Sequence, residues 1–409
     1  MTRRLIVLGA GPIGIETALH AAEAGFDVRV LEAGQVGAHL LAWGHVRMFS
    51  PWAMNCSALG LHHLTRAGRS PLRDPAACPT GGELARRYVQ PLARSAALRR
   101  RVVTGCRVIG VSRDRLLKGD RIGRPDRAAH PFRILAQRGS REVIFEAELV
   151  VDVTGTFGQP RYFGNGGLPA PGERRAAARI DYRPVDFVTR RREFAGRRLL
   201  LIGDGHTAAT AAVALGELAV ADPRTRIFWV LRTERAPFFA RVAHDPLPAR
   251  DRLMAEAEAI AGGAVAGIEP LPGAVVEAIA EAAPGSTAAR GRPLRVTLSV
   301  GARRVSLVVD RILAHTGFQP DRSLYSELQV HECYVSGGPM KLAAALLGAA
   351  SADCMAQPVP AADLLSNPEP GFYILGSKSY GRGSSFLLRT GLQQIDTLLT
   401  ALGPAGQVA

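Results

Sequence analysis

The sequence is short of lysine and of paired cysteines, and these shortages exclude several kinds of protein. Only Lys118, Lys341 and Lys378 are lysine, so the net charge of +15 comes from arginine. The arginines are scattered, and no helix-turn-helix, RRM or zinc-finger pattern accompanies them, which argues against nucleic acid as a partner. The five cysteines show no paired spacing, which argues against a disulfide framework and against a zinc site.

Long apolar runs are missing as well. No stretch is long and apolar enough to cross a bilayer, so we expect no membrane partner and predict a cytoplasmic location. His62 and His63 have no partners at ligand spacing, so we predict no metal site. At 409 residues and 47% hydrophobic content, the chain can bury the cores of two or three domains.

The first glycine-rich turn follows a short apolar segment, residues 4–8. Three glycines then stand in the order G-x-G-x-x-G, and the next residues predict a helix and a second strand that ends at Glu32. In this fingerprint, one glycine makes the turn, one lets the backbone approach a pyrophosphate, and one lets helix pack on strand. Because an acid at the strand end repels a 2′-phosphate, the turn predicts FAD or NAD. The expected contacts are Gly9, Gly11, Pro12, Gly14 and Glu32.

A second turn of the same shape lies in residues 199–212, LLLIGDGHTAATAA. Its three small positions are Gly203, Gly205 and Ala208. His206 is placed either to touch a nicotinamide or to cap the following helix. The next strand ends in Arg232 rather than in an acid, with Arg235 close behind. Two guanidinium groups suit a 2′-phosphate, so this turn predicts NADPH rather than NADH.

A short phrase follows two strands that lie far apart in the chain. Thr154-Gly155 occurs in ELVVDVTGTFGQPRY, and Thr316-Gly317 occurs in VVDRILAHTGFQPD. Together with the two turns, these phrases resemble flavoproteins with two dinucleotide-binding domains: thioredoxin-reductase-like enzymes and the flavin-containing and N-hydroxylating monooxygenases. In that family, the phrases lie where the chain passes between the FAD domain and an inserted NAD(P)H domain.

The resemblance implies an α/β fold with two Rossmann-like domains. The FAD domain is expected to be discontinuous, built from residues 1–190 and 310–409, with the NAD(P)H domain inserted as residues 191–309. The first turn then holds FAD and the second holds NADPH. Family members are often dimers, so a homodimer is compatible with the resemblance. Further residues expected near the cofactors are Thr154, Gly155, Gly317 and Gly376.

The C-terminal segment GFYILGSKSYGRGSSFLLRTGLQQIDTLLTAL reads as a strand, a polar loop and an amphipathic helix. In the family, this segment closes over the flavin, often with a Gly-Asp pair at the ribityl chain. Gly376-Ser377 stands in its place, so that aspartate contact is lost. Lys378 and Arg382 follow, and a cation near the flavin would stabilise an anionic reduced flavin or a peroxide. The alternative for Lys378 is a loop position in solvent.

Two cofactors imply that hydride passes from NADPH to FAD, which leaves the electron acceptor to be identified. Oxygen is one acceptor, because flavin monooxygenases form a C4a-hydroperoxide and transfer one oxygen atom to nitrogen or sulfur. The family places residues 42–55, AWGHVRMFSPWAMN, beside the flavin ring, and their aromatic and polar side chains suit a ligand pocket. Asn55 is the expected peroxide contact. Substrate contacts are expected from Trp43, His45, Arg47, Ser50 and Trp52, unless the tryptophans only pack a domain junction.

A small disulfide is the other acceptor. The chain has no Cys-x-x-Cys, but Cys56 lies in a region where some single-cysteine flavoprotein reductases place their thiol. A lone cysteine is also commonly a small buried apolar residue. A flavoprotein that acts as a scaffold or an NADPH sensor, without turnover, is a third interpretation.

One departure separates the chain from two groups of the family. Flavin-containing and Baeyer–Villiger monooxygenases carry F-x-G-x-x-x-H-x-x-x-[WY] before the second turn. This chain reads LPAPGERRAAARIDYRPVDF there, with Tyr182 near the aromatic position but no histidine. We therefore predict an NADPH-dependent FAD monooxygenase outside those groups, acting on nitrogen or sulfur of a small molecule. The charged segment 114–131 is expected to be an exposed loop of the FAD domain.

Overall fold

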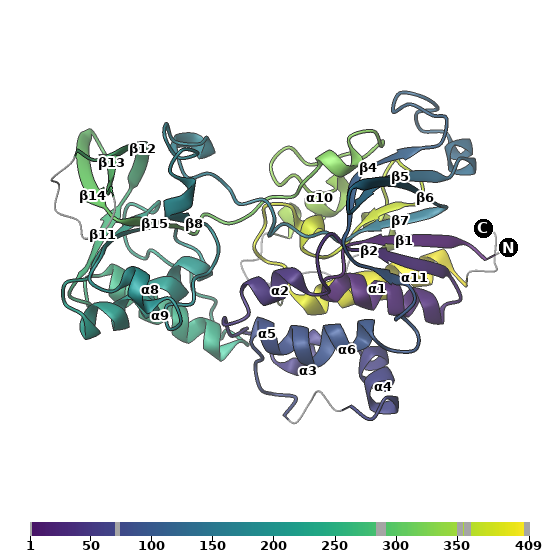
Figure 1. The fold of residues 1–409 in the computed structure, drawn as a ribbon, viewed down its shortest axis with the longest axis horizontal. Helices are drawn as coiled ribbons and strands as arrows, with labels where there is room; N and C mark the ends of the chain where they lie inside the picture. Colours follow the sequence, from purple (N-terminus) through teal and green to yellow (C-terminus); the bar gives the residue numbers. More distant parts are fainter. Residues whose placement is uncertain (1, 70–73, 284–291, 350–354, 356–360, 405–409) are drawn as a thin grey trace. The chain divides into compact units, whose positions relative to one another are not determined.

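The chain forms two compact units in the computed structural model (Figure 1). The structure describes residues 2–69, 74–283, 292–349, 355 and 361–404. Unit 1 is Met1–Gln159 together with Phe318–Ala409, and unit 2 is Pro160–Gly317. Within the described ranges, no helix is long and apolar enough to cross a membrane.

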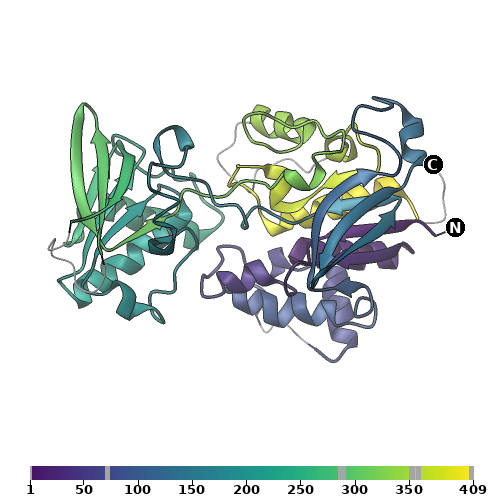
Figure 2. The same ribbon diagram turned by 45° about the horizontal axis from the view of Figure 1, so that its top comes forward.

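A five-stranded parallel sheet forms the centre of unit 1, in the order β16-β7-β1-β2-β3. Its strands are β1 (Arg4–Leu8), β2 (Asp27–Leu31), β3 (Val102–Val103), β7 (Leu149–Asp152) and β16 (Phe372–Ile374). One face is covered by the helices α1 (Pro12–Glu23) and α11 (Leu388–Leu402). The other face is covered by an antiparallel sheet of β4 (Cys106–Arg113), β5 (Phe132–Arg138) and β6 (Arg141–Ala147), as Figure 1 and Figure 2 show.

The apolar run of β1 is explained by these two covers. Leu5 and Val7 pack with α1 and α11, whereas Ile6 and Leu8 pack with the antiparallel sheet. A parallel strand buried on both faces needs a continuous apolar run, which is the pattern that marks this strand in the sequence. Short helices complete unit 1: α2 (Ala38–Ala42), α3 (Trp52–Asn55), α4 (Ala58–Arg66), α5 (Gly81–Leu84), α6 (Gln90–Ala93) and α10 (Met340–Gly348).

Unit 2 repeats the same layers. Its parallel sheet has the order β11-β10-β9-β15-β8. The strands are β8 (Ile180–Asp181), β9 (Arg198–Ile202), β10 (Arg226–Leu231), β11 (Ile268–Pro272) and β15 (Arg311–Ala314). The helices α8 (His206–Ala221) and α9 (Pro248–Ala261) cover one face. The antiparallel strands β12 (Ala274–Glu281), β13 (Leu294–Val300) and β14 (Arg303–Val309) cover the other.

The unit boundaries differ from the predicted domain boundaries. The sequence places the inserted domain at residues 191–309, whereas the second compact unit runs from Pro160 to Gly317. Strand pairing explains the difference, because β15 pairs with β9 on one side and with β8 on the other. Both β8 and β15 therefore belong to the sheet of unit 2, although they lie outside the predicted range.

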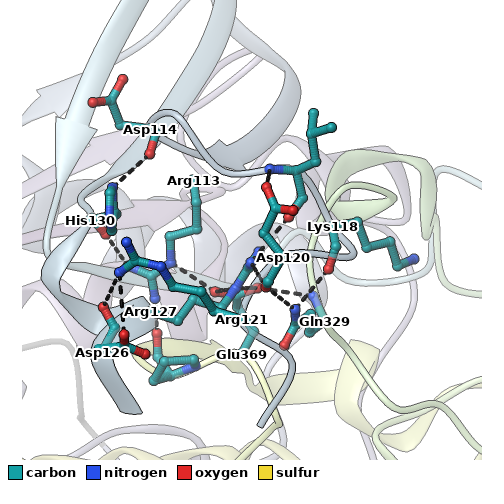
Figure 3. Close-up of polar contacts among 12 residues, drawn as sticks. Arg113, Asp114, Lys118, Asp120, Arg121, Asp126, Arg127, His130, Gln329 and Glu369 are labelled. Carbon is teal, nitrogen blue, oxygen red and sulfur yellow. Dashed lines mark hydrogen bonds and ion pairs between the residues drawn. The ribbon is translucent and has the colours of Figure 1, made fainter. Parts of the chain in front are cut away.

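The charged segment 114–131 is anchored more firmly than an exposed loop. The side chain of Arg127 is fully buried, and its Nε donates to both carboxylate oxygens of Glu369 at 3.0 Å (Figure 3). Arg113, which is also buried, donates from Nε to Glu369 Oε1 at 2.7 Å. Arg127 Nη1 additionally donates to the carbonyl oxygens of Leu117 and Asp120, at 3.1 and 2.8 Å. The prediction of an exposed loop is thus correct for most of the segment and wrong for Arg127, which is buried.

Candidate functional site

The first turn leaves β1 with the backbone geometry of a dinucleotide-binding fingerprint. Gly9 has φ +102°, a left-handed conformation, and a Cβ at Gly14 would lie 2.0 Å from the carbonyl oxygen of Gly9. A Cβ at Gly11 would meet no atom within 4 Å, so the backbone there borders open space. The helix α1 begins at Pro12, and the free N–H groups of its first turn are available to an anion.

Glu32 follows β2 and borders the same space. Its Oε2 accepts a hydrogen bond from the N–H of Ala10 at 2.7 Å, and its Oε1 accepts one from the N–H of Gly34 at 2.7 Å. These backbone donors hold the carboxylate beside the turn, and each oxygen keeps a lone pair for a hydroxyl group. The arrangement fits the ribose contact expected of this acid.

A cavity of about 710 Å³ lies against the first turn, within the size range of ligand sites in proteins. Its walls come from the turn, from the carboxyl end of β7 and from the segment after β16. In open parallel sheets, ligands bind beyond the carboxyl ends of the strands, which is where this cavity lies. The predicted residues in its lining are Gly9, Gly11, Pro12, Glu32, Trp43, Ser50, Thr154, Gly155 and Gly376.

Only part of the aromatic and polar segment 43–55 contributes to this cavity. Trp43 and Ser50 line it. Trp52 is buried, and the guanidinium of Arg87 lies 5.3 Å from the centre of its ring. His45 and Arg47 are exposed, and Arg47 donates to the carbonyl oxygen of Cys78. These last three predicted substrate contacts, at positions 45, 47 and 52, therefore lie outside the cavity wall that the structure describes.

Asn55 is used within its own turn. Its side chain is buried, and its Nδ2 donates to the carbonyl oxygens of Ser50 at 2.9 Å and Pro51 at 2.8 Å. Its Oδ1 accepts a hydrogen bond from Ser50 Oγ at 2.9 Å. Both amide hydrogens are thus committed to the backbone, which differs from the predicted role as a hydrogen-bond donor to a peroxide. Asn55 instead fixes the position of Ser50, which lines the cavity.

Lys378 forms a buried ion pair behind the cavity wall. Its Nζ lies 2.6 Å from Asp152 Oδ2 and 3.0 Å from Thr154 Oγ1, and the side chain is fully buried. The ammonium also lies 5.1 Å from the ring of Tyr325. The alternative of a loop lysine in solvent is therefore wrong, because the side chain is buried, whereas a cation near the flavin stays a prediction. Lys378 acts on the cavity through Thr154, which lines it.

The remaining predicted residues of unit 1 near the C-terminal segment divide between two places. Gly376, with φ +70°, lines the large cavity beside Ser377, and its N–H donates to Gln394 Oε1 at 2.8 Å. Arg382 is exposed and lines a smaller cavity, where its Nη2 donates to Gln319 Oε1 at 3.1 Å. Arg382 is therefore not part of the wall around the first turn, as far as the described residues define it.

Cys56 is buried beside a carboxylate. Its residue exposure is 7%, and burial together with the negative charge of Glu16 raises the pKa of its thiol. Glu16 is itself held by hydrogen bonds from the hydroxyl groups of Ser57, at 2.8 Å, and Tyr88. A thiolate, which is the reactive form of cysteine, is disfavoured in such a place. Cys354 lies outside the described residues.

The second turn repeats the geometry of the first. Gly203 has φ +127°, and a Cβ there would lie 2.4 Å from the carbonyl oxygen of His315. A Cβ at Gly205 would meet nothing within 4 Å, as at Gly11. Ala208 occupies the third small position on α8, and its own Cβ is 3.5 Å from where a Cβ at Gly203 would be. The alanine therefore fits without the close approach that requires glycine at position 14 of the first turn.

The residues expected at the nicotinamide cofactor follow the carboxyl ends of strands in this second sheet. Arg232 follows directly after β10 with 88% of its side chain exposed, and its Nε lies 3.5 Å from Asp204 Oδ2. Arg235 is exposed, and His206 is the exposed first residue of α8. Gly317, with φ +86°, ends unit 2, and its carbonyl oxygen accepts the N–H of Arg161 at 3.0 Å. Within the described part of the chain, no group of three or more His, Cys, Asp or Glu could hold a metal ion.

Sequence reasoning missed several aromatic residues of the large cavity. Its lining includes His39, Phe157 and Phe386. The rings of His39 and Phe157 are 5.4 Å apart, and those of Phe157 and Phe318 are 4.7 Å apart. A signal was present for Phe157 alone, because both Thr-Gly phrases contain a phenylalanine shortly before Gln-Pro, in TGTFGQP and TGFQP.

Comparisons with known proteins agree with this architecture. A model of the pyridine nucleotide-disulphide oxidoreductase family matches residues 6–118, which hold the first turn. No curated protein matches the chain. A bacillithiol disulfide reductase from Bacillus cereus is similar in structure, with a TM-score of 0.69 and 18% identity, covering 98% of this chain and 99% of that one.

Two structures of monooxygenases are similar as well. The cadaverine monooxygenase DfoA from Erwinia amylovora, bound to FAD, has a TM-score of 0.65 at 11% identity, covering 100% of this chain and 96% of its own. An ornithine N-hydroxylase from Kutzneria has a TM-score of 0.60 at 15% identity, covering 98% and 99%. At such identities, the likeness concerns the fold. The chain therefore has the α/β fold of the flavoproteins with two Rossmann-like dinucleotide-binding domains, so the fold that the sequence resemblance implies is confirmed.

Proposed function

We propose that the chain is an FAD-dependent NADPH oxidoreductase, with FAD in the cavity of unit 1. A pyrophosphate suits the open space at Gly11 and the N-terminus of α1. A ribose suits the carboxylate of Glu32. Bound there, FAD would supply two-electron chemistry between NADPH and a second acceptor. The protein's part is to hold the pyrophosphate on α1, to fix the ribose with Glu32, and to present Trp43 and Ser50 in the same wall.

NADPH is assigned to the second turn, in unit 2. Gly205 leaves the same open space as Gly11, and α8 offers the free N–H groups of its first turn. Arg232 lies at the end of β10, where a 2′-phosphate would be recognised. In this structure its guanidinium forms an ion pair with Asp204. The exposed Arg235 adds a second cation.

We assign oxygen as the electron acceptor, and nitrogen or sulfur of a small molecule as the site of oxygenation. The observation that carries this choice is the state of Cys56, which is buried beside Glu16 with a raised pKa. Among the described cysteines, Cys106 alone lines the cavity, and its N–H donates to the carbonyl oxygen of Glu32, so it belongs to the ribose end. A disulfide reductase needs an accessible thiolate near the flavin ring, and neither Cys56 nor Cys106 offers one.

Isotope labelling tests this assignment. The FAD-loaded protein is given NADPH, isotope-labelled dioxygen and a panel of primary amines and thioethers, and the products are weighed by mass spectrometry. In a monooxygenation, one oxygen atom enters the substrate and the other leaves as water, with both electrons coming from NADPH. We expect a product with one labelled oxygen. If all electrons from NADPH were recovered as hydrogen peroxide with every nucleophile, the assignment as a monooxygenase would be wrong.

A disulfide reductase is the second candidate, because a bacillithiol disulfide reductase has a TM-score of 0.69 with this chain. The same NADPH assay without oxygen separates the two, with a small disulfide as the acceptor. Steady NADPH consumption in either assay also eliminates a scaffold or an NADPH sensor without turnover.

A further inference from the structure

We propose that a second cavity of unit 1 binds a small carboxylate, with Arg382 as the group that holds the anion. The cavity has a volume of about 340 Å³. It is polar and carries both charged and aromatic side chains. The lining residues that matter here are Gln159, Gln319, Asp321, Arg322, Tyr334 and Arg382.

One guanidinium of this cavity has no ion-pair partner among the described residues. Arg322 is paired with Glu332, with its Nη1 at 3.3 Å from Glu332 Oε2. Arg382 donates to the neutral oxygen of Gln319 at 3.1 Å, and no carboxylate among the described residues pairs with it. A planar guanidinium with free N–H groups takes a carboxylate through two parallel hydrogen bonds. Arg382 is thus the natural partner of an incoming anion.

Asp321 also faces this cavity and limits what can bind. Burial would raise the pKa of this carboxyl, but hydrogen bonds from Ser323 and the charge of Lys378 hold it below its usual value. Its Oδ1 accepts both the N–H of Ser323 at 3.0 Å and the Ser323 hydroxyl at 2.6 Å. Asp321 Oδ1 is therefore committed to local donors, and an anion held by Arg382 would not need to displace them.

The wall that carries Arg382 is locked in place. The N–H of Arg382 donates to the carbonyl oxygen of Ser336 at 2.8 Å. A Cβ at Gly381 would lie 2.2 Å from that same oxygen, and a Cβ at Gly338 would lie 2.6 Å from the carbonyl oxygen of Ser379. Glycine is thus required on both loops for them to approach so closely. A preformed wall loses little conformational entropy when a ligand binds.

The chain between the lining residues Arg322 and Tyr334 is held by the buried network around Glu369. The backbone N–H of Gln329 donates to Glu369 Oε2 at 2.9 Å, and its side-chain Nε2 donates to the carbonyl oxygens of Lys118 and Asp120, at 2.7 and 2.9 Å (Figure 3). These bonds fasten the chain between Arg322 and Glu332 to the charged segment 114–131. The segment therefore has a structural task that its exposed charges do not reveal.

The cavity adjoins the proposed FAD site. Gln159 and Asp321 line both cavities. A carboxylate held by Arg382 would place the rest of the molecule beside the larger cavity. The inference therefore rests on the proposed function, and it adds the substrate class: a small molecule with a carboxylate. Tyr334 is 93% exposed as a residue, and its ring offers a face on which a flat apolar body can lie.

Calorimetric titration of the FAD-loaded full-length protein with benzoate tests the proposal. We expect saturable binding, weakened about tenfold or more by Arg382→Gln, because a charge-assisted bidentate contact is lost. Tyr334→Ala should weaken it about threefold to tenfold. Arg100→Gln is the matched control, since Arg100 is an exposed arginine of the same unit that lines neither cavity, and it should bind benzoate as the wild type does.

Three outcomes would overturn the proposal. These are the absence of saturable benzoate binding, unchanged binding in Arg382→Gln with a normal circular dichroism spectrum, and equal binding of inorganic phosphate without any effect of Tyr334→Ala. The last would make the cavity a general anion site rather than a carboxylate site. NADPH oxidation in air is measured separately, so that a protein that turns over without binding benzoate contradicts only this inference.

Discussion

The glycines of the first turn differ in what a side chain would meet, which separates binding from folding. A Cβ at Gly11 meets nothing within 4 Å, so Gly11→Ala should fold as the wild type does. It should nevertheless lose FAD affinity by about tenfold or more, because the methyl group occupies the space where a pyrophosphate approaches the backbone. The ratio of flavin to protein absorbance after gel filtration, beside a thermal melt, measures both effects.

Gly14→Ala is the matched comparison. Its Cβ would lie 2.0 Å from the carbonyl oxygen of Gly9, so α1 must move away from β1. Overpacking of this kind costs about 1–3 kcal/mol or more. The variant should therefore melt earlier than the wild type, whatever its flavin content. If Gly11→Ala retains a full complement of FAD, the cavity at the first turn is not the flavin site.

Cys56 should be dispensable. Its thiol is buried, and burial together with Glu16 raises its pKa, so little thiolate forms at neutral pH. Cys56→Ser is expected to retain NADPH-dependent turnover within about twofold, since a hydroxyl nearly matches the thiol in size. Alkylation by iodoacetamide at pH 8 should reach Cys78, which is partly exposed, before Cys56. If this variant lost disulfide-dependent turnover, a disulfide reductase that uses Cys56 would become the favoured function.

Arg232 should decide between the two nicotinamide cofactors. Its side chain is 88% exposed, and among the described residues it forms an ion pair with Asp204 alone, so a 2′-phosphate can reach it. Arg232→Ala should weaken NADP⁺ binding about tenfold and leave NAD⁺ binding unchanged, because only NADP⁺ carries that phosphate. Arg224→Ala, which removes an equally exposed arginine paired with Asp222, is the control. Equal losses for both cofactors would contradict the assignment.

At the scale of elements, the segment 114–131 depends on the charge of Glu369. This buried carboxylate accepts from Arg113 and Arg127, which are both buried. Glu369→Gln leaves two guanidinium groups without a counter-charge, and the loss of one partner from a buried ionic cluster costs about 3–5 kcal/mol. Urea unfolding should show this loss, and proteolysis within 114–131 should become faster.

The exposed pair Arg4–Glu148 provides the comparison for that variant. Its side chains are 44% and 42% exposed, and its atoms lie 2.9 Å apart. Glu148→Gln should change the free energy of unfolding by about 1 kcal/mol or less, because water already solvates both charges. Equal effects of the two substitutions would mean that the buried network does not anchor the segment.

The parallel strands that lead into a glycine-rich turn could be predicted from the sequence, and the antiparallel ones could not. β1 and β9 are apolar runs that lead directly into a glycine-rich turn, so local signals suffice. The strand β6 alternates between exposed and half-buried residues and carries no turn motif of that kind. Arg127 looks like every other arginine of its charged segment, because its burial depends on Glu369, which lies 242 positions away in the chain.

The candidate site divides in the same way. The glycines and Glu32 were found because each contact is set by the local turn. Trp43 and Ser50 line the cavity, whereas Trp52 is buried in the core. Whether one of these residues lines the cavity depends on the path of the short helices α2 and α3. That path is set by packing against α1 and the segments around Tyr88, so it cannot be predicted from the local sequence pattern.

At the scale of the whole molecule, the insertion of one unit into another predicts that the inserted unit folds alone. Unit 2 has its own parallel sheet and its own two cores, one on each face. A fragment of residues 160–317 should therefore give a cooperative thermal transition and bind NADP⁺ in preference to NAD⁺. Circular dichroism and calorimetric titration of the purified fragment measure these two properties.

The shorter fragment 191–309 decides whether the boundaries matter. It lacks β8 and β15, and β15 pairs directly with β9. Ile312 and Leu313 of β15 are fully buried, one in each core of the unit, so their removal opens both faces of the sheet. We expect this fragment to be unfolded or aggregated. A cooperative, NADP⁺-binding 191–309 would show that the sheet closes without β15, and the boundaries read from the sequence would then be the functional ones.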